Sequence, residues 1–200
     1  MKVLRTELPE VLILEPQVFE DARGSVHESY SRRAFREAAG VEAEFVQDNL
    51  SRSVKNVIRG LHYQVVKPQG KLIYALRGEI YDVAVDLRRS SPTFGRWVGA
   101  NLSAENRRMM WVPEGFAHGF VVLSDRAEFL YKTTDYYAPE HERTLLWNDP
   151  AIGIKWPLEP SDPCAGLACR RTHSGSPRAP PAGLACRYSQ AIGGWHMVIV

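Results

Sequence analysis

The chain of 200 residues has few cysteines, no long apolar run and almost no net charge. Its three cysteines, Cys164, Cys169 and Cys186, all lie near the C-terminus, and their odd number argues against a disulfide framework. No apolar run reaches the roughly 20 residues that a membrane-spanning helix needs. A formal net charge of +2 is too small to indicate nucleic acid or an acidic membrane as a partner.

The composition is that of a soluble globular protein, with 44% hydrophobic and 24% charged residues. The first seven residues, MKVLRTE, lack the apolar stretch of a signal peptide. We therefore expect a cytoplasmic protein whose length suffices for one domain with a substantial core.

Residues 1–158 are expected to form one all-β domain. Short runs rich in Val, Ile, Tyr, Phe and Trp are separated by Gly, Pro, Ser and Asn, which is typical of a β-sandwich or jelly roll. The predicted strands are Val11–Leu14, Leu72–Leu76, Glu79–Leu87, Trp97–Leu102, Met109–Val112, Phe120–Leu123 and Glu128–Thr133.

Local signals predict three details of this domain. In Ile80–Leu87, apolar side chains at alternate positions from Tyr81 share one face of a strand. The Arg77-Gly78-Glu79 step predicts a tight hairpin turn. One short helix is expected, capped by Ser31 and ended by Gly40.

Residues 159–200 differ from the rest. They are crowded with Pro, Gly, Ser, Ala, Arg and Cys, and AGLACR occurs twice, at 165–170 and 182–187. Such a segment buries too little apolar surface to offset its ordering entropy, so we expect a poorly ordered tail. Our hypothesis is a shifted reading frame or a replaced C-terminus.

The Pro-x-Gly-x-x-His pattern at Pro113–His118 indicates a cupin, a jelly-roll barrel with a small-molecule site in its mouth. Many cupins bind a metal through two closely spaced histidines, but here the pair reads His62-Tyr63-Gln64. Lys71 adds a positive charge near the expected cation position. The sequence therefore predicts no metal.

A metal-free site of this composition holds a base, an acid and cations. Neutral His62 can accept a proton, Tyr131 can return one, and Lys71 can stabilise an oxyanion on a carbonyl. Together these roles fit proton abstraction beside a ketone and reprotonation on the opposite face, which is epimerisation through an enolate. Taken singly, each of these side chains is more often structural in a strand, and His118 is compatible with a hydrogen-bonded core histidine; the combination favours the catalytic interpretation.

Seven segments in order carry a resemblance to a known family: residues 11–16, 45–49, 59–64, 91–95, 101–106, 113–120 and 146–149. Through them the chain resembles the dTDP-4-dehydrorhamnose 3,5-epimerase family from about Val11 to Leu158. The resemblance implies a homodimeric cupin without metal or cofactor that epimerises C3 and C5 of dTDP-4-dehydro-6-deoxy-D-glucose.

The resemblance also implies roles for individual residues. His62 would be the general base and Tyr131 the general acid, with Lys71 at the developing enolate. The substrate-binding positions would be Arg23, Glu28, Gln47, Asp48, Asn49, Arg59, His118, Tyr136 and Glu142. Tyr136 would stack on the thymine, and Arg23 and Glu28 would reach the site of the partner subunit.

The sequence departs from the family at two places. Ser25-Val26-His27 stands where the family has apolar aromatic residues against the nucleotide base. The family's C-terminal Ser-x-Lys-Asp motif, whose aspartate pairs with the catalytic histidine, is replaced by residues 164–169, with Asp162 the nearest substitute. In serine proteases, disabling the orienting aspartate lowers turnover about 10⁴-fold. We therefore expect folding and dTDP-sugar binding with slow turnover.

Two alternatives stay open at this stage. One is epimerisation at a single carbon of a related dTDP-4-ketosugar, which His62 and Tyr131 would serve equally well. The other is a catalytically impaired dTDP-sugar-binding cupin.

Overall fold

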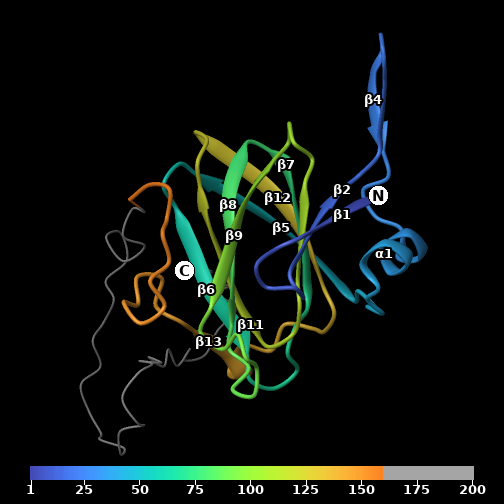
Figure 1. Ribbon diagram of the computed structural model, residues 1–200. Coiled ribbons are helices and arrows are strands. Elements are labelled where there is room, and N and C mark those ends of the chain that lie inside the picture. The colour runs from blue at the N-terminus through green and yellow to red at the C-terminus, as the bar shows by residue number, and fades with distance from the viewer. Residues whose placement is uncertain (160–200) are drawn as a thin grey trace, which may run out of the picture.

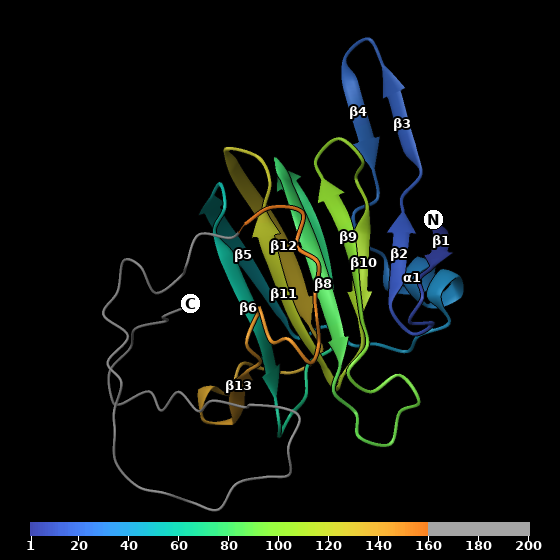
Figure 2. The same ribbon diagram turned by 60° about the vertical axis from the view of Figure 1, so that its left-hand side comes forward.

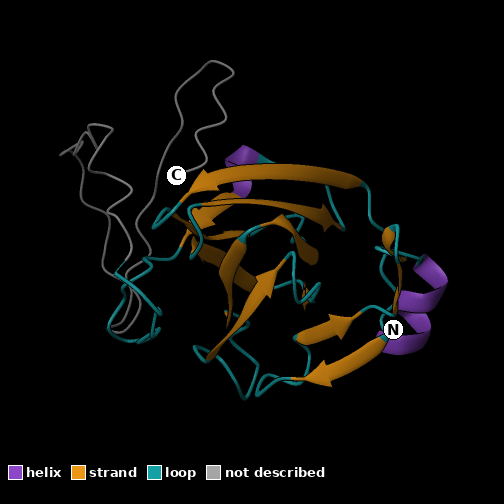
Figure 3. Ribbon diagram, turned by 90° about the horizontal axis from the view of Figure 1, so that it is seen from above, coloured by secondary structure: helices purple, strands orange, loops and turns teal. Residues whose placement is uncertain are grey.

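Two antiparallel β-sheets face each other in the computed structural model, which describes residues 1–159 (Figure 1). In order, the first sheet holds β1 (Lys2–Arg5), β2 (Leu12–Glu15), β10 (Met109–Val112), β7 (Lys71–Arg77), β12 (Arg126–Thr133) and β5 (Gln47–Val54). The second holds β13 (Glu142–Thr144), β6 (Ile58–Gln64), β11 (Phe116–Val122), β8 (Glu79–Asp86) and β9 (Trp97–Ser103). Seen from above, they enclose a common interior (Figure 3). The all-β jelly-roll prediction is confirmed.

The main core lies between the sheets. It includes Ile73 and Phe129 from the first sheet and Ala84 and Phe120 from the second. The rings of Phe120 and Phe129 meet edge to face with centroids 4.4 Å apart, joining the two layers. Each fully buried side chain of this size contributes about 1.5–3 kcal/mol by leaving water.

Strand β8 is buried on both faces, and its alternation is as predicted. Ile80 and Ala84 point into the main core. Val83 and Val85 point the other way, into a second cluster with Leu145 and Ile152. The segment that follows β13 therefore covers the outer face of the second sheet.

The predicted helix is confirmed as α1 (Arg32–Ala39). The backbone N–H of Ala34 donates to the Ser31 hydroxyl at 3.3 Å, and Gly40 ends the helix with a φ of 69°. Phe35 is buried against Trp111 of β10, which anchors the helix to the face of the first sheet that lies opposite the main core. One further short helical turn, η1 (Pro139–His141), precedes β13.

The predicted hairpin at Gly78 is wrong. Gly78 makes a tight turn with a φ of 71°, but β7 pairs with β10 and β12, whereas β8 pairs with β11 and β9. The turn therefore carries the chain from one sheet to the other. This difference follows from the burial of both strands on both faces, which leaves no polar face to indicate the pairing.

Strand β11 begins at Phe116, four residues before the predicted Phe120–Leu123, so His118 is a strand residue. The sequence reading also missed β1, β5, β6 and β13, and the hairpin of β3 (Val18–Asp21) and β4 (Gly24–His27). Strand β5 carries polar residues on both faces, which conceals the period of a strand. The β3–β4 hairpin projects away from both sheets with Phe19 and Val26 exposed (Figure 2).

Neither α1 nor any other helix in residues 1–159 has the length and apolar character needed to cross a membrane.

Candidate active site

The interior between the sheets brings together the three predicted catalytic residues. His62 lies on β6, directly opposite His118 of β11 in the strand register. Lys71 and Tyr131 come from β7 and β12 of the facing sheet. Nζ of Lys71 donates to the backbone carbonyl of His62 at 3.4 Å and so connects the two sheets at this point.

A close approach of two backbones positions His62 against His118. Gly60 on β6 has a φ of 121°, and a Cβ added there would lie 2.4 Å from the Cα of Gly119 on β11. The register of β6 and β11 shifts between His118 and Phe120, next to this contact. Glycine at both positions thus lets the strands carrying the two histidines touch.

His62 has a carboxylate and a hydroxyl beside one ring nitrogen. Its Nδ1 is 3.5 Å from Oε1 of Glu142 and 3.3 Å from Oγ1 of Thr144, both on β13. The hydroxyl of Tyr137 donates to Oε2 of Glu142 at 3.0 Å. Nε2 is the second ring nitrogen of His62 that can carry or accept a proton.

Lys71 is buried, with 7% of its surface exposed. Burial lowers the pKa of its ammonium to about 8, although the charges of Glu142 and Asp82 oppose this change. The group is therefore mostly a cation at neutral pH, in a place where water screens its charge poorly.

Tyr131 keeps its proton. Burial raises the pKa of its phenol, the charge of Glu142 raises it further, and Arg59 acts in the opposite direction. A protonated phenol facing the interior is suited to donate a proton.

His118 is a buried histidine with a carboxylate partner. Its Nε2 lies 2.8 Å from Oδ1 of Asp82 on β8. Sequence reasoning missed Asp82, Thr144 and Tyr137, although the alternation in β8 already placed Asp82 and Ala84 on one face. The partners on β13 left no such signal, because that strand has three residues.

Strand β5 lines the interior beside this cluster. The side chain of Gln47 donates to Oδ1 of Asn49 at 2.9 Å and accepts from the backbone N–H of Tyr137 at 3.1 Å. Nε of Arg59 donates to Oγ of Ser53 at 3.0 Å. Tyr136, on the loop after β12, is 61% exposed and thus open to a stacking partner.

Three predicted binding residues lie apart from this cluster in the single chain. Asp48 points to the opposite face of β5, where Nζ of Lys132 contacts both its oxygens at 3.0 and 2.9 Å. Arg23 lies at the tip of the projecting hairpin, paired with Asp21, and Glu28 follows the hairpin in an exposed position.

Gln64 replaces the second cupin histidine, and its side chain is hydrogen-bonded to the backbone of two loops. Its side-chain amide donates to the carbonyl of Lys67 at 2.7 Å and accepts from the N–H of Ala138 at 2.8 Å. Among residues 1–159, no three His, Cys, Asp or Glu side chains are grouped as a metal site would require.

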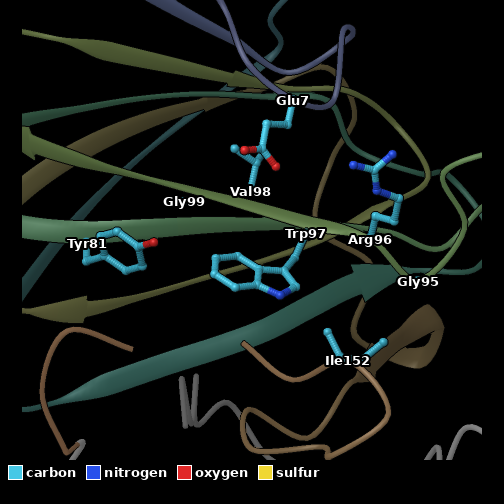
Figure 4. A pocket seen from close by; sticks show the side chains of 8 residues that line it. All are labelled: Glu7, Tyr81, Gly95, Arg96, Trp97, Val98, Gly99 and Ile152. Atoms are coloured by element: carbon cyan, nitrogen blue, oxygen red, sulfur yellow. The ribbon is translucent and has the colours of Figure 1, made fainter. Parts of the chain in front are cut away.

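A pocket of about 520 Å³ lies elsewhere, beside β8 and β9 (Figure 4). Tyr81, Trp97 and Ile152 line it, and all three pack with the cluster on the outer face of the second sheet. None of the predicted catalytic residues lines this pocket. Residues 160–200 of the predicted tail, with Asp162 and the three cysteines, lie outside the described residues.

Comparison with known proteins identifies the family. Residues 5–170 match the family model described as dTDP-4-dehydrorhamnose 3,5-epimerase. The chain belongs to the dTDP-4-dehydrorhamnose 3,5-epimerase family. The family assignment made from the sequence motifs is thereby confirmed.

Relatives share most of their length with this epimerase-family chain. A dTDP-4-dehydrorhamnose 3,5-epimerase of Pseudomonas aeruginosa is 64% identical over 159 residues, covering 80% of this chain and 88% of the relative. The crystal structure of the Legionella pneumophila epimerase in complex with dTDP-4-keto-L-rhamnose gives a TM-score of 0.77 at 52% identity, covering 78% and 84%. ChmJ, a 3'-monoepimerase from Streptomyces bikiniensis, gives a TM-score of 0.73 at 33% identity, covering 80% and 81%.

Proposed function

We propose that this chain epimerises C3 and C5 of dTDP-4-dehydro-6-deoxy-D-glucose to give dTDP-4-dehydro-L-rhamnose, in dTDP-rhamnose biosynthesis. The observation that carries the proposal is the contact of Lys71 with the His62 carbonyl, with Tyr131 on the paired strand β12, in a chain that belongs to this family. The Legionella pneumophila relative, solved with dTDP-4-keto-L-rhamnose, supports a dTDP-sugar as the ligand.

In the proposed reaction, His62 removes a proton from the carbon next to the C4 ketone. The C–H bond breaks, its electrons move to the C4 oxygen, and an enolate forms. The buried ammonium of Lys71 stabilises that negative charge, because a cation in a poorly screened interior acts strongly at short range. Tyr131 then donates its proton to the opposite face of the same carbon, which inverts it.

The remaining predicted residues are proposed to hold the nucleotide sugar. His118, held by Asp82, and Glu142 would contact the sugar. Gln47 and Asn49 would bind by hydrogen bonds, and Tyr136 would stack on the base. Arg59 suits the diphosphate, because its planar guanidinium binds phosphate oxygens in pairs.

We further propose that the active enzyme is a homodimer, in which Arg23 and Glu28 act at the partner's site. Arg23 lies on the β3–β4 hairpin, which projects away from both sheets with Phe19 and Val26 exposed, and Glu28 directly follows it; this supports the proposal. Mixing inactive Arg23→Ala and His62→Ala chains tests it. Restored activity in the mixture is expected if each site takes residues from two chains, and no restoration would refute a shared site.

Identification of the product tests the proposed reaction. Purified protein is incubated with dTDP-4-dehydro-6-deoxy-D-glucose in D₂O, and the product is analysed by NMR. Inversion and deuterium at both C3 and C5 are expected. Deuterium at C3 alone would favour a single-carbon epimerase, a second candidate that the similarity to ChmJ supports. Binding of dTDP without exchange would favour the impaired binding cupin.

A further inference from the structure

Glu142 lies where two strands bring a carboxylate to the proposed catalytic base. Strand β13 pairs antiparallel with β6, so that Thr144 is opposite His62 and Glu142 is opposite Gln64. Residues two apart on a strand share a face, and therefore both β13 side chains point to the side of the imidazole. They contact the same ring nitrogen, Nδ1, at 3.5 and 3.3 Å.

The carboxylate of Glu142 is held at both oxygens. Oε1 faces His62, while Oε2 accepts the hydroxyl of Tyr137 at 3.0 Å. The side chains of His62 and Glu142 are 22% and 30% exposed, so water screens this pair less than it would an ion pair on the open surface. The contact is thus both oriented and electrostatically effective.

We propose that Glu142 is the positioning residue of His62. Its negative charge beside Nδ1 favours the tautomer that carries the proton on that nitrogen, so that the lone pair of Nε2 faces the substrate carbon. When Nε2 takes the substrate proton, the same carboxylate stabilises the imidazolium that forms. The inference rests on the function proposed above and adds a role for Glu142 beyond contact with the sugar.

The other charged and titratable groups that residues 1–159 place near His62 have different contacts. Lys71 contacts the His62 backbone carbonyl, and its positive charge opposes protonation of the imidazole. On β11, His118 is engaged with Asp82. Tyr131 of β12 and Tyr137 both have a raised pKa, chiefly through burial, and are neutral at physiological pH. Glu142 is the carboxylate with an oxygen at the imidazole among residues 1–159.

This arrangement bears on the altered C-terminus. The family's orienting aspartate was expected beyond residue 159, whereas Glu142 belongs to β13 of the barrel. The proposed pairing therefore needs no contribution from the tail, and it gives His62 a carboxylate even where the Ser-x-Lys-Asp motif is missing.

Titration of the His62 imidazole by NMR tests the pairing directly. In Glu142→Gln, the side chain keeps its size and loses its charge, so the titration midpoint of His62 is expected to fall by about one pH unit. The matched control is Glu140→Gln, two residues earlier on η1, whose carboxylate lies 3.7 Å from His141. That variant is expected to leave the His62 midpoint in place.

Kinetics supply the second measurement. Glu142→Gln is expected to lower kcat about 10- to 100-fold, with KM changing less, and to move the acidic limb of the kcat/KM profile to lower pH together with the midpoint. Glu142→Asp keeps a carboxylate one methylene further back, so smaller changes in kcat and in the pH profile are expected. This variant also provides the test if Glu142→Gln does not fold.

An unmoved His62 midpoint in both Glu142 variants would overturn the pairing, whatever their activity. A shifted midpoint in Glu142→Gln, with no exchange by the wild-type protein, would instead retain the pairing and reject the proposed function. The two failures are therefore distinguishable.

Discussion

Nε2 of His118 lies 2.8 Å from Oδ1 of Asp82, and both side chains are buried. The pair links neighbouring strands β11 and β8 at the level of His62. Oδ2 of Asp82 has no hydrogen-bond partner within the described part of the chain, and the charge of Asp82 acts on Lys71. Asp82 therefore acts on two residues that are proposed to contact the substrate. It pairs with His118, and its charge opposes the lowering of the pKa of Lys71 by burial.

The pH dependence of the reaction tests the role of Lys71. Burial lowers the pKa of its ammonium to about 8, and only the protonated form stabilises the enolate. Activity is therefore expected to fall as the pH rises through about 8. In Asp82→Asn the opposing carboxylate charge is lost, which lowers the pKa of Lys71 further and moves this fall to lower pH. Profiles of kcat/KM against pH measure both effects, and an identical alkaline limb in the two proteins would contradict the account.

Replacing Tyr131 tests its proposed role as the general acid independently of the role of His62 as the general base. Tyr131→Phe keeps the ring in the core and removes the proton donor, so kcat for epimerisation is expected to fall roughly 10²–10⁴-fold. His62 still removes the substrate proton, exchanges it with D₂O and returns a deuteron to the same face. Deuterium incorporation without inversion is therefore expected by NMR in D₂O. Undiminished inversion would show that another group protonates the enolate.

An ion-pair cluster at the end of β8 is expected to contribute strongly to the free energy of unfolding. Burial opposes ionisation of Asp86, but hydrogen bonds from Arg88, Ser91 and Thr93 outweigh it and hold the pKa of its carboxyl well below the ordinary range. Arg88 also contacts Glu10 and lies over the ring of Phe116, 4.6 Å from its centroid.

Arg88→Ala is expected to lower the free energy of unfolding by about 3–5 kcal/mol, because it leaves Asp86 as an unpaired buried charge. Arg89→Ala, at the exposed neighbouring position, is expected to stay within about 0.5 kcal/mol. Urea denaturation compares the two. Since the folded pKa of Asp86 is depressed, its contribution is complete above the unfolded value of about 3.9 and is lost as the pH falls toward the folded value. Equal stability of the two variants would contradict this role.

Gly60 tests the close approach of β6 and β11. An added methyl group would overlap the Gly119 backbone, so Gly60→Ala is expected to cost about 2 kcal/mol or more. Gly153 also has a positive φ, but the nearest atom to an added Cβ is 3.9 Å away. Gly153→Ala therefore isolates the backbone term of about 1 kcal/mol. Thermal unfolding provides the comparison, and equal costs would rule out the steric argument.

The sequence predicted the fold class because the local signals agreed. Alternation in β8, the cap at Ser31 and the stop at Gly40 all have short-range causes, and the structure confirms each. The pairing of β7 and β8 was predicted wrongly, because register between sheets depends on contacts far apart along the chain. A tight turn at Gly78 serves a hairpin and a crossover between sheets equally well.

The candidate site was likewise predicted only in part. His62, Lys71 and Tyr131 were selected by residue type and family pattern, and the structure places them around one interior. Asp82 and Glu142 acquire their contacts only through cross-strand register, which no local pattern carries. Arg23, Glu28 and Asp48 stay predictions, because a single chain does not bring them to His62.

Solvent exchange in the wild-type protein and in His62→Ala tests the central claim most directly. Both proteins are incubated with dTDP-4-dehydro-6-deoxy-D-glucose in D₂O, and the C3 and C5 proton signals are followed by NMR, with dTDP binding measured in parallel. The account predicts exchange at both carbons in the wild-type protein and none in His62→Ala, which still binds dTDP. Exchange that persists in His62→Ala, or its absence from the wild-type protein, would contradict the account.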